Sequence, residues 1–384
     1  MTNIIVSVRD AVGTGGGSVA LNTCKEFSKK GNNVIIVSDY PVFVDGCQNI
    51  CMPYGEKLNE WKPNLKVFRI LRHFLQIFMF SLFGFYKIKL YENKGYISID
   101  HNVESFGADI IVMHNIFIYQ YLADKRRFLD RIKQFCNPVF LFRIIREWSA
   151  VNFGKSHFLV SVSDTALCEI DYINKKNKKS VVIENGVNLE KFKIISESEA
   201  KDIKTKLGCD NKFVVLFVGH EFVRKRLDLA LKTISNLDEK FVLWVVGGRS
   251  GNNRSFEKLT IKLGLSHRVF FLGSLEDPEI IMSAADAFIL LSDYETWGMV
   301  AIEALASGTP CIMTNVGCAQ SVIKNGSNGY IVKNVEEATK ALIEIDSNIN
   351  NVDYSILSRK SVEKYSWENV AEKYLEIILE CEKK

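Results

Sequence analysis

Two glutamates with seven residues between them, Glu295 and Glu303, enclose the start of an expected helix. A strand-like apolar run leads into a glycine-containing loop here, and a helix is expected over residues 299–306. The first amides of a helix have no partner within it, so they can hold an anion. These amides belong to Gly298, Met299 and Val300. Because carboxylates accept hydrogen bonds from hydroxyl groups, the pattern indicates a site for a phosphate with hydroxyls on either side.

A second group of residues places positive charge at the end of a strand. The strand expected at residues 213–218 runs to Gly219, and Arg224, Lys225 and Arg226 open the next helix. Cations beside a helix N-terminus run against the preference set by the helix dipole. A bound polyanion would account for them.

A third group is a glycine-rich loop after the first expected strand, where glycines let the backbone approach a ligand. The loop contains Gly15, Gly16 and Gly17. It misses the dinucleotide pattern G-x-G-x-x-G because Ser18 stands where the third glycine belongs. Asp39, at the end of the second expected strand, is roughly where a ribose-binding acid would be. A dinucleotide-dependent oxidoreductase therefore stays open, as does a turn that needs glycine only for its geometry.

The elements that must position these residues form two series. Strand-like apolar runs alternate with helical patterns, which predicts βαβ units with parallel sheets. The first series has strands at residues 3–8, 33–38, 109–113, 158–162 and 180–184, with a helix at 18–30. The second has strands at residues 213–218, 241–246, 269–272, 287–291 and 311–314. Each series predicts one Rossmann-like sheet.

The length of 384 residues exceeds the size at which one hydrophobic core usually stops growing, so two domains are expected. The polar stretch at residues 188–211 is the natural linker between them. We predict an N-terminal domain at residues 1–190 and a C-terminal domain at residues 191–365. A last helical pattern, within residues 366–384, has no strand after it and is free to pack elsewhere.

Composition and charge narrow the function classes. Residues 1–190 hold 24 Lys+Arg against 18 Asp+Glu, a net charge of +6, and the remainder holds 25 against 27, a net charge of −2. There is no arginine-rich tract or nucleic-acid motif, so DNA and RNA are not expected partners. The nine cysteines are scattered and complete no zinc pattern, which fits reduced thiols of the cytosol. The N-terminal apolar run is too short for a signal peptide.

The glutamate pair and the residues after it, Glu295-TWGMVAI-Glu303-ALASGTP, resemble the hallmark of the retaining GT-B glycosyltransferases of glycosyltransferase family 4. The flanking phrases FLGSLEDPEIIMSAADAFILLS, GSNGYIV and VIENGVNLEKF agree with that family. The resemblance covers most of residues 213–380, and in the first half only the glycine loop, the strand ending in His114 and VSVSD at residues 160–164. The departures are Arg226 and Cys318 for glycine, Trp297 for phenylalanine and Ser321 for glutamate.

This resemblance implies an α/β GT-B fold, in which two Rossmann-like βαβ domains face a central cleft. The acceptor would bind to residues 1–190 and the nucleotide sugar to residues 191–365. The terminal helix, residues 366–384, would cross back and pack on the N-terminal domain.

The resemblance also implies roles for single residues. Glu303 would bind the donor ribose, and Glu295 would face the donor sugar. Arg224 and Lys225 would neutralise the departing diphosphate. Donor contacts would come from Gly219, Trp297, Gly298, Met299 and Val300, and acceptor or phosphate contacts from Gly15, Gly16 and Gly17. His114 would lie across the cleft near the reacting sugar, although a purely structural role stays open.

No metal and no cofactor are expected besides the nucleotide-diphosphate sugar, which is a co-substrate. No DxD pair appears in a suitable loop, and two cations with helix amides can do the work of a metal. We therefore expect a retaining hexosyltransferase that uses a nucleotide sugar, UDP being favoured, in cell-surface polysaccharide synthesis. The acceptor would be a saccharide or a lipid-linked saccharide. The alternatives are a nucleotide-sugar epimerase or another GT-B enzyme, an oxidoreductase and a non-catalytic nucleotide-sugar-binding protein.

A membrane surface is the last expected partner. Residues 67–91 have an aromatic-rich apolar centre flanked by Arg69 and Arg72 on one side and Lys87 and Lys89 on the other. The uncharged part, residues 74–86, is too short to span a bilayer but suits its interface. The basic run at residues 124–135 lies in the same half of the chain. These segments predict a cytoplasmic protein, peripheral on the inner face of the cell membrane, unless residues 67–91 form a buried helix.

Overall fold

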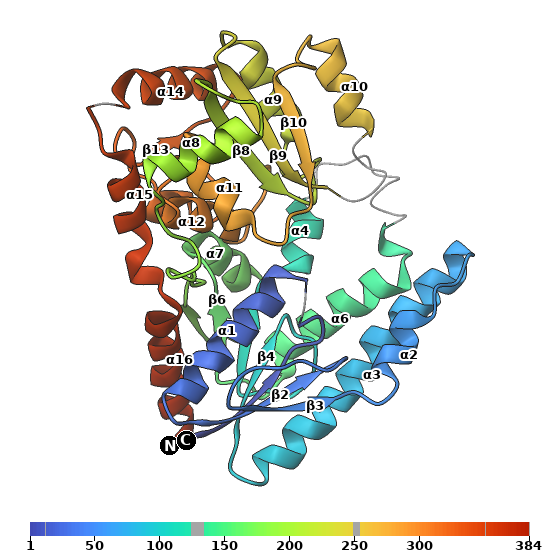
Figure 1. Cartoon of the computed structure of the whole chain (residues 1–384). Coiled ribbons are helices and arrows are strands. Elements are labelled where there is room, and N and C mark those ends of the chain that lie inside the picture. The colour runs from blue at the N-terminus through green and yellow to red at the C-terminus, as the bar shows by residue number, and fades with distance from the viewer. Residues whose placement is uncertain (12, 124–133, 249–253, 350, 384) are drawn as a thin grey trace. The chain divides into compact units, whose positions relative to one another are not determined.

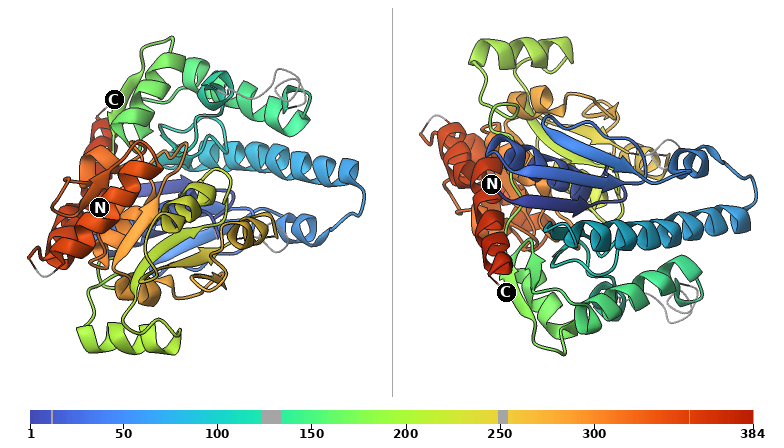
Figure 2. Two further views of the ribbon diagram at one scale, coloured as in Figure 1. Left: turned by 90° about the horizontal axis from the view of Figure 1, so that it is seen from above. Right: turned by 90° about the horizontal axis from the view of Figure 1, so that it is seen from below.

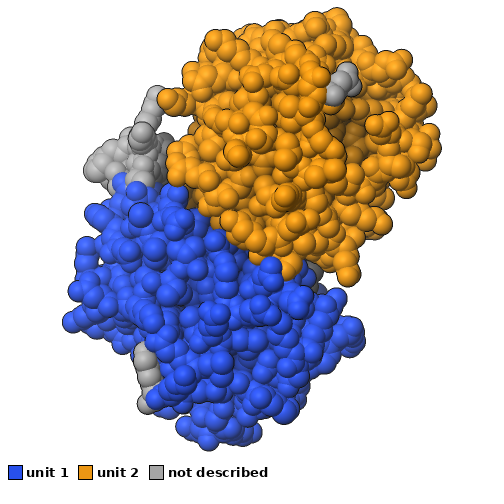
Figure 3. Space-filling model, turned by 90° about the vertical axis from the view of Figure 1, so that its left-hand side faces the viewer, with its two compact units in different colours: residues 1–186, 367–384 blue, residues 187–366 orange. Residues whose placement is uncertain are grey.

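The computed structural model describes residues 1–11, 13–123, 134–248, 254–349 and 351–383. The chain forms two compact units (Figures 1 and 3). Unit 1 contains Met1–Gly186 and Trp367–Lys384, and unit 2 contains Val187–Ser366. The first crossing between the units comes four residues before the boundary predicted at residue 190, and the second comes one residue after the boundary predicted at residue 365.

Unit 1 is built on a seven-stranded sheet in the order β3-β2-β1-β4-β5-β6-β7, in which every pairing is parallel. Its strands are β1 (Asn3–Ser7), β2 (Asn33–Ser38), β3 (Cys47–Cys51), β4 (Ile97–His101), β5 (Ile110–Met113), β6 (Phe158–Ser161) and β7 (Lys179–Val182). Its helices are α1 (Gly15–Lys29), α2 (Gly55–Glu60), α3 (Lys66–Glu92), α4 (Phe117–Ala123), α6 (Pro138–Phe153), α7 (Asp164–Ile173) and α16 (Trp367–Glu382).

The central strands of unit 1 are apolar along their whole length because helices cover both faces of the sheet. Ile4 and Ile5 of β1 point to opposite faces, and both are fully buried. The predicted strands of the first series all form. Two further strands, β3 and β4, were not predicted from the sequence. The reason is that β3 is a half-exposed edge strand and β4 carries the polar residues Asp100 and His101.

Unit 2 is built on a six-stranded parallel sheet in the order β10-β9-β8-β11-β12-β13. Its strands are β8 (Phe213–Gly219), β9 (Phe241–Gly247), β10 (Val269–Gly273), β11 (Ala287–Leu290), β12 (Cys311–Met313) and β13 (Gly329–Ile331). Its helices are α8 (Glu197–Lys206), α9 (Leu227–Ser235), α10 (Arg254–Lys262), α11 (Pro278–Ala284), α12 (Met299–Ala306), α13 (Ala319–Val322), α14 (Val335–Asn348), α15 (Tyr354–Val362) and the short η1 (Glu363–Tyr365).

The stretch predicted as a linker, residues 188–211, contains α8. Ser196 and Glu199 form a capping box at its start, since each side chain accepts a hydrogen bond from the other residue's backbone amide. This local signal for a helix start was present in the sequence, but the polar composition of the stretch obscured it.

The terminal helix α16 belongs to unit 1 and packs against α1. Phe27 of α1 meets Tyr374 of α16 edge to face, with ring centroids 6.3 Å apart. At the base of α16, a Cβ on Gly186 would lie 2.6 Å from Trp367 Cε3, so only glycine lets the chain pass this close to the indole.

The helix α3 presents one face to the core of unit 1 and the other to solvent. It packs against β1, β2, β4 and α6 (Figure 2). Its buried side includes Ile77, Phe80 and Ile88, whereas Leu82 and Tyr86 are more than half exposed. With 27 residues and a mean hydropathy of 1.3 in its most apolar window, α3 is long and apolar enough to cross a membrane by length and composition. Residues 74–86, the uncharged part expected to be too short to span a bilayer, are thus the middle of a longer helix.

Candidate active site

Unit 2 positions the cationic pair in the turn after β8. Gly219 ends β8, and Arg224 and Lys225 follow in this turn. A Cβ on Gly219 would lie 2.2 Å from Lys225 Cδ, so any side chain there would displace the lysine. Arg226, just before α9, has a φ of 55°, a left-handed conformation that glycine adopts at lower cost. This conformation explains why glycine would suit that position.

Glu295 joins both cations. Its Oε1 lies 2.8 Å from Lys225 Nζ and 3.1 Å from the Nη1 atom of Arg224, and it accepts a hydrogen bond of 3.0 Å from Ser292 Oγ. Burial alone would raise the pKa of Glu295, but Lys225 and Arg224 outweigh burial and hold this pKa below its usual value. Glu295 is thus an ionised, buried carboxylate that pairs with both cations and balances one of their two charges.

The loop after Glu295 turns sharply into α12. Gly298, the residue before this helix, has a φ of 95°, and no side chain caps the helix start. A Cβ on Gly317 would lie 2.3 Å from the carbonyl oxygen of Trp297, and Cys318 N donates to this oxygen at 2.7 Å. Met299 and Val300 begin α12, so their amides have no partner inside the helix. The turn leaves a short helix N-terminus in the same loop as Glu295.

Trp297 itself points into the protein. Its indole is 1% exposed and packs edge-on against Tyr365, with ring centroids 5.3 Å apart, inside unit 2. Its position suits support of the loop through packing, while the backbone of residue 297 holds Cys318.

Glu303 lies in α12, about one turn beyond Met299, and is partly exposed. Burial raises the pKa of its carboxyl to about 7, and Lys191 and Lys225 only partly oppose this rise. Glu295 pairs with both cations just before α12, and Glu303 lies in this same helix, so the four residues belong to one region of unit 2.

In unit 1 the glycine loop opens α1. Thr14 caps the helix by accepting a hydrogen bond of 3.0 Å from Gly17 N. A Cβ on Gly17 would lie 2.3 Å from the carbonyl oxygen of Asp10, and one on Gly16 would lie 3.1 Å from His114 Cδ2. Gly15 has open space around it. Close packing against the backbone therefore requires glycine at residue 17, and the space for a side chain at residue 16 is tight.

A pocket of about 450 Å³ adjoins this loop within unit 1. Its lining includes Ala11, Gly13, Ser18, Lys25, Phe43 and Asp45. It provides space for a ligand beside the N-terminal part of α1.

His114 follows β5 and is buried beside a second histidine. Its Nε2 lies 2.9 Å from His101 Nδ1, and the two rings stack with centroids 5.2 Å apart. Burial lowers the pKa of His114 to about 4, so the ring is neutral at pH 7. Because the pair occupies Nε2, only Nδ1 of His114 is left for another partner. The sequence analysis missed His101, which ends β4 in a part of the chain that the family resemblance does not cover.

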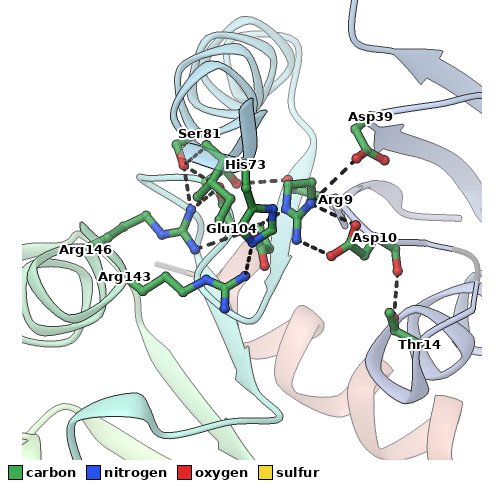
Figure 4. A network of polar contacts seen from close by, with 12 residues as sticks. Arg9, Asp10, Thr14, Asp39, His73, Ser81, Glu104, Arg143 and Arg146 are labelled. Carbon is green, nitrogen blue, oxygen red and sulfur yellow. Dashed lines mark hydrogen bonds and ion pairs between the residues drawn. The ribbon is translucent and has the colours of Figure 1, made fainter. Parts of the chain in front are cut away.

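Charged residues also gather at the carboxyl ends of β1, β2 and β4 (Figure 4). They are Arg9, Asp10, Asp39, Glu104, Arg143 and Arg146. Asp39, the possible ribose-binding acid, is 2% exposed and lies 3.8 Å from the Nη1 atom of Arg9. Burial raises its pKa to about 7. Of these six residues only Asp39 was singled out from the sequence, because the others follow no motif.

Among the residues that the structure describes, no three His, Cys, Asp or Glu side chains are grouped so that they could hold a metal ion. Most of the basic run at residues 124–135, namely residues 124–133, lies outside the described residues.

Comparison with known proteins finds a family match within unit 2. Residues 199–354 match the family described as glycosyl transferases group 1. An uncharacterized glycosyltransferase of Methanocaldococcus jannaschii is 28% identical over 242 residues, which cover 58% of this chain and 62% of that relative. The alignment thus spans less than two thirds of the relative.

Solved structures resemble the whole chain. WaaG, a glycosyltransferase involved in lipopolysaccharide biosynthesis, has a TM-score of 0.76 at 18% identity, with 98% of this chain and 99% of WaaG covered. The Anabaena protein HepE in complex with UDP-glucose has a TM-score of 0.72 at 14% identity, with 99% and 100% covered. Together these comparisons show that the chain has the α/β GT-B fold and that its residues 199–354 match the glycosyl transferases group 1 family.

Proposed function

We propose that this protein is a retaining glycosyltransferase that transfers a hexose-type sugar from a nucleotide-diphosphate sugar. The observation that carries the proposal is the convergence of Lys225 and Arg224 on Glu295, next to the start of α12. Two cations and unpaired helix amides are the groups that stabilise a departing diphosphate. This set lies in the unit whose sequence matches the glycosyl transferases group 1 family.

In the proposed reaction, the bond between the anomeric carbon and the β-phosphate oxygen breaks, and the acceptor hydroxyl oxygen bonds to that carbon on the same face. The hydroxyl proton passes to the departing phosphate. Arg224 and Lys225 neutralise the charge that grows on the diphosphate, in place of a metal. Glu303 accepts hydrogen bonds from the ribose hydroxyls, and Glu295 faces the donor sugar. His114 of unit 1 would contact the reacting sugar through its Nδ1 atom.

We favour UDP as the nucleotide, since HepE, which has the same fold, binds UDP-glucose. For the acceptor we favour a saccharide or a lipid-linked saccharide of cell-surface polysaccharide synthesis. WaaG, which also has this fold, takes part in lipopolysaccharide biosynthesis. The half-exposed apolar face of α3 fits a protein that works at the cytoplasmic surface of a membrane.

A panel of UDP-, GDP- and ADP-sugars would test the proposal. Thermal stabilisation identifies the donor, because a ligand that binds only the folded state raises stability with its affinity. The identified donor is then incubated with a mixture of membrane saccharides and lipid-linked saccharides, and release of nucleoside diphosphate is measured. Release that requires the acceptor fraction supports transfer. A sugar converted into an isomer, with no release, would support an epimerase instead.

Lys225→Ala and Lys232→Ala give this assay a matched pair of variants. Both remove one lysine charge from the same region of unit 2, but Lys232 is an exposed residue in α9. Only the Lys225 variant should lose release. Equal loss in both variants would contradict the assignment of the site.

A further inference from the structure

The carboxyl ends of β1, β2 and β4 lie side by side in the sheet of unit 1, because these strands are neighbours in the order β2-β1-β4. Ligands of open parallel sheets bind at this edge, where the strand order reverses. The chain places Arg9 after β1, Asp39 after β2 and Glu104 after β4. Helices α3 and α6 add His73, Arg143 and Arg146 to this edge (Figure 4).

Two of the three arginines in this cluster have carboxylate partners. Arg9 Nε lies 3.1 Å from Glu104 Oε2, and Arg9 also pairs with Asp10 and Asp39. The Nη2 atom of Arg146 lies 3.4 Å from the same Glu104 oxygen. The Nη1 atom of Arg146 donates to Ser81 Oγ at 2.6 Å. These contacts account for all three carboxylates of the cluster.

Arg143 has no such partner. No carboxylate of the described residues lies within ion-pair distance of its guanidinium. Its contacts are His73 Nε2, 3.4 Å from Nη2, and the ring of Phe117, whose centroid is 5.2 Å from Cζ. Its Nε is buried and has no hydrogen-bond partner. Neither a neutral imidazole nor an aromatic ring neutralises a guanidinium charge.

The surroundings make this position unfavourable for a lone cation. Burial lowers the pKa of Arg143, and the charges of Arg9 and Arg146 lower it further, whereas the carboxylates of Glu104 and Asp10 raise it. Burial together with Arg143 also lowers the pKa of His73 to about 4, so the imidazole is neutral. A partly buried cation is costly unless an anion accompanies it. An external anion would complete the cluster.

We infer that Arg143 is the anion-binding residue of unit 1 and that it takes a phosphate or diphosphate ester group of the acceptor. This inference rests on the proposed function, since it specifies the charge class of the acceptor. A guanidinium presents a fork of N–H donors that matches phosphate oxygens, and the partly exposed Arg143 pairs with no carboxylate of the described residues.

The same two helices offer a surface for a lipid chain on that phosphate. Trp148 of α6 and Leu82 of α3 are about half exposed, and α3 packs against α6. A phosphate that joins a sugar to a lipid would thus find a cation and an apolar surface on one pair of helices. We therefore propose that the phosphate bound by Arg143 belongs to a lipid. A water-soluble sugar phosphate is the alternative that the test must distinguish.

The test measures binding to the full chain by titration calorimetry, with saturating UDP present to occupy Arg224 and Lys225. The probes are dihexanoyl phosphatidic acid below its micelle concentration, neutral dihexanoylglycerol and inorganic phosphate. Arg143→Gln removes the charge, Arg143→Lys keeps it without the fork, and Lys176→Gln removes a charge from an exposed turn elsewhere in unit 1. The UDP dissociation constant is measured first in every variant and should not change.

The parent and Lys176→Gln should bind phosphatidic acid equally, and Arg143→Gln should bind it about ten- to a hundredfold more weakly, the range for a hydrogen bond to a charged group. Arg143→Lys should fall between them, and dihexanoylglycerol should bind weakly to all. If inorganic phosphate binds as tightly as phosphatidic acid, the anion site is supported, but the proposal that a lipid carries the phosphate is overturned. Equal affinity of the parent and Arg143→Gln, or no binding by the parent, would overturn the inference. Absence of UDP binding by the parent would refute the choice of UDP in the proposed function, separately from the inference about Arg143.

Discussion

Lys225 Nζ lies 2.8 Å from Glu295 Oε1, and both side chains are about nine-tenths buried. The carboxylate therefore pairs with the cation to which the proposed function assigns the donor diphosphate. Binding of a donor must replace this ion pair, at least in part, with contacts between lysine and phosphate. In this exchange Lys225 keeps a negatively charged partner with and without the donor. The free-energy cost of burying an unpaired lysine is thus avoided in both states.

Lys225→Ala should lower turnover by about ten- to a thousandfold, as expected when one preorganised charge-stabilising donor is lost. The lysine stabilises charge that develops on the leaving diphosphate, so the loss should fall mainly on kcat. Steady-state rates of nucleoside diphosphate release check this, with Lys232→Ala as the exposed control. Near-normal turnover in a folded Lys225→Ala protein would show that this lysine has no catalytic role.

Glu295→Ala should separate turnover from nucleotide affinity. The variant loses a contact with the donor sugar, so turnover should fall. It also frees Lys225 and Arg224 from their carboxylate, so the affinity for UDP should stay equal or increase. Calorimetric titration with UDP beside the kinetic assay measures both. A large parallel loss of UDP affinity would mean that Glu295 serves mainly to hold the cations in place.

Glu303 should give donor binding a pH dependence. Burial raises the pKa of its carboxyl to about 7, so the group is largely protonated at pH 6 and ionised at pH 8. The ionised form accepts stronger hydrogen bonds from the ribose, so affinity for UDP-glucose should rise with pH across this window. UDP-glucose suits the measurement because its phosphates do not titrate there. Glu303→Gln should flatten the profile, and Glu303→Ala should weaken binding by about 1.5–3 kcal/mol.

The sequence was most informative where burial and chemistry impose strong local patterns. The strands around Ile5 and Leu216 are apolar because both faces of each sheet are covered, and the segment from Glu295 to Glu303 carries its motif in one loop. The pairing of Lys225 with Glu295 could not be predicted, since it joins residues 70 positions apart through the register of β8 and β11.

Unit 1 was harder to predict for a related reason. His101 meets His114 only because β4 inserts beside β5, and β4 has a polar sequence that does not read as a buried strand. Arg143 belongs to a helix without any motif, and its isolation becomes visible only once the partners of Arg9 and Arg146 are known. Tertiary pairing, rather than local propensity, sets both features.

Asp100 should make the protein less stable as pH rises. This carboxyl is fully buried, and burial raises its pKa to about 8; Oδ1 accepts hydrogen bonds from Ser105, while Oδ2 has no partner. The folded state then binds a proton that the unfolded state releases near pH 4, so stability falls between about pH 4 and pH 8. Melting temperatures should therefore be lower at pH 8.5 than at pH 6. Asp100→Asn keeps the Oδ1 acceptor and should reduce this difference, whereas an unchanged slope would assign the dependence to other carboxyls.

The exposed face of α3 should bind anionic membranes. Phe80 is fully buried, so its replacement tests folding, whereas Met79 and Leu82 are exposed and lie on one side of the helix. The Met79→Ser/Leu82→Ser variant should keep the parent's melting temperature and lose sedimentation with phosphatidylglycerol vesicles. Phe80→Ser should instead unfold at lower temperature, because replacing a buried phenylalanine with a small residue costs about 3–5 kcal/mol.

Raised salt concentration distinguishes the electrostatic part of membrane binding from the apolar part. Each basic residue near the surface contributes about 1 kcal/mol and is screened within a Debye length, so raised salt should release part of the parent protein. The fraction that stays bound should depend on Met79 and Leu82, because apolar burial is not screened. Equal sedimentation of the parent and the double variant, at low and at high salt, would show that α3 does not contact the membrane.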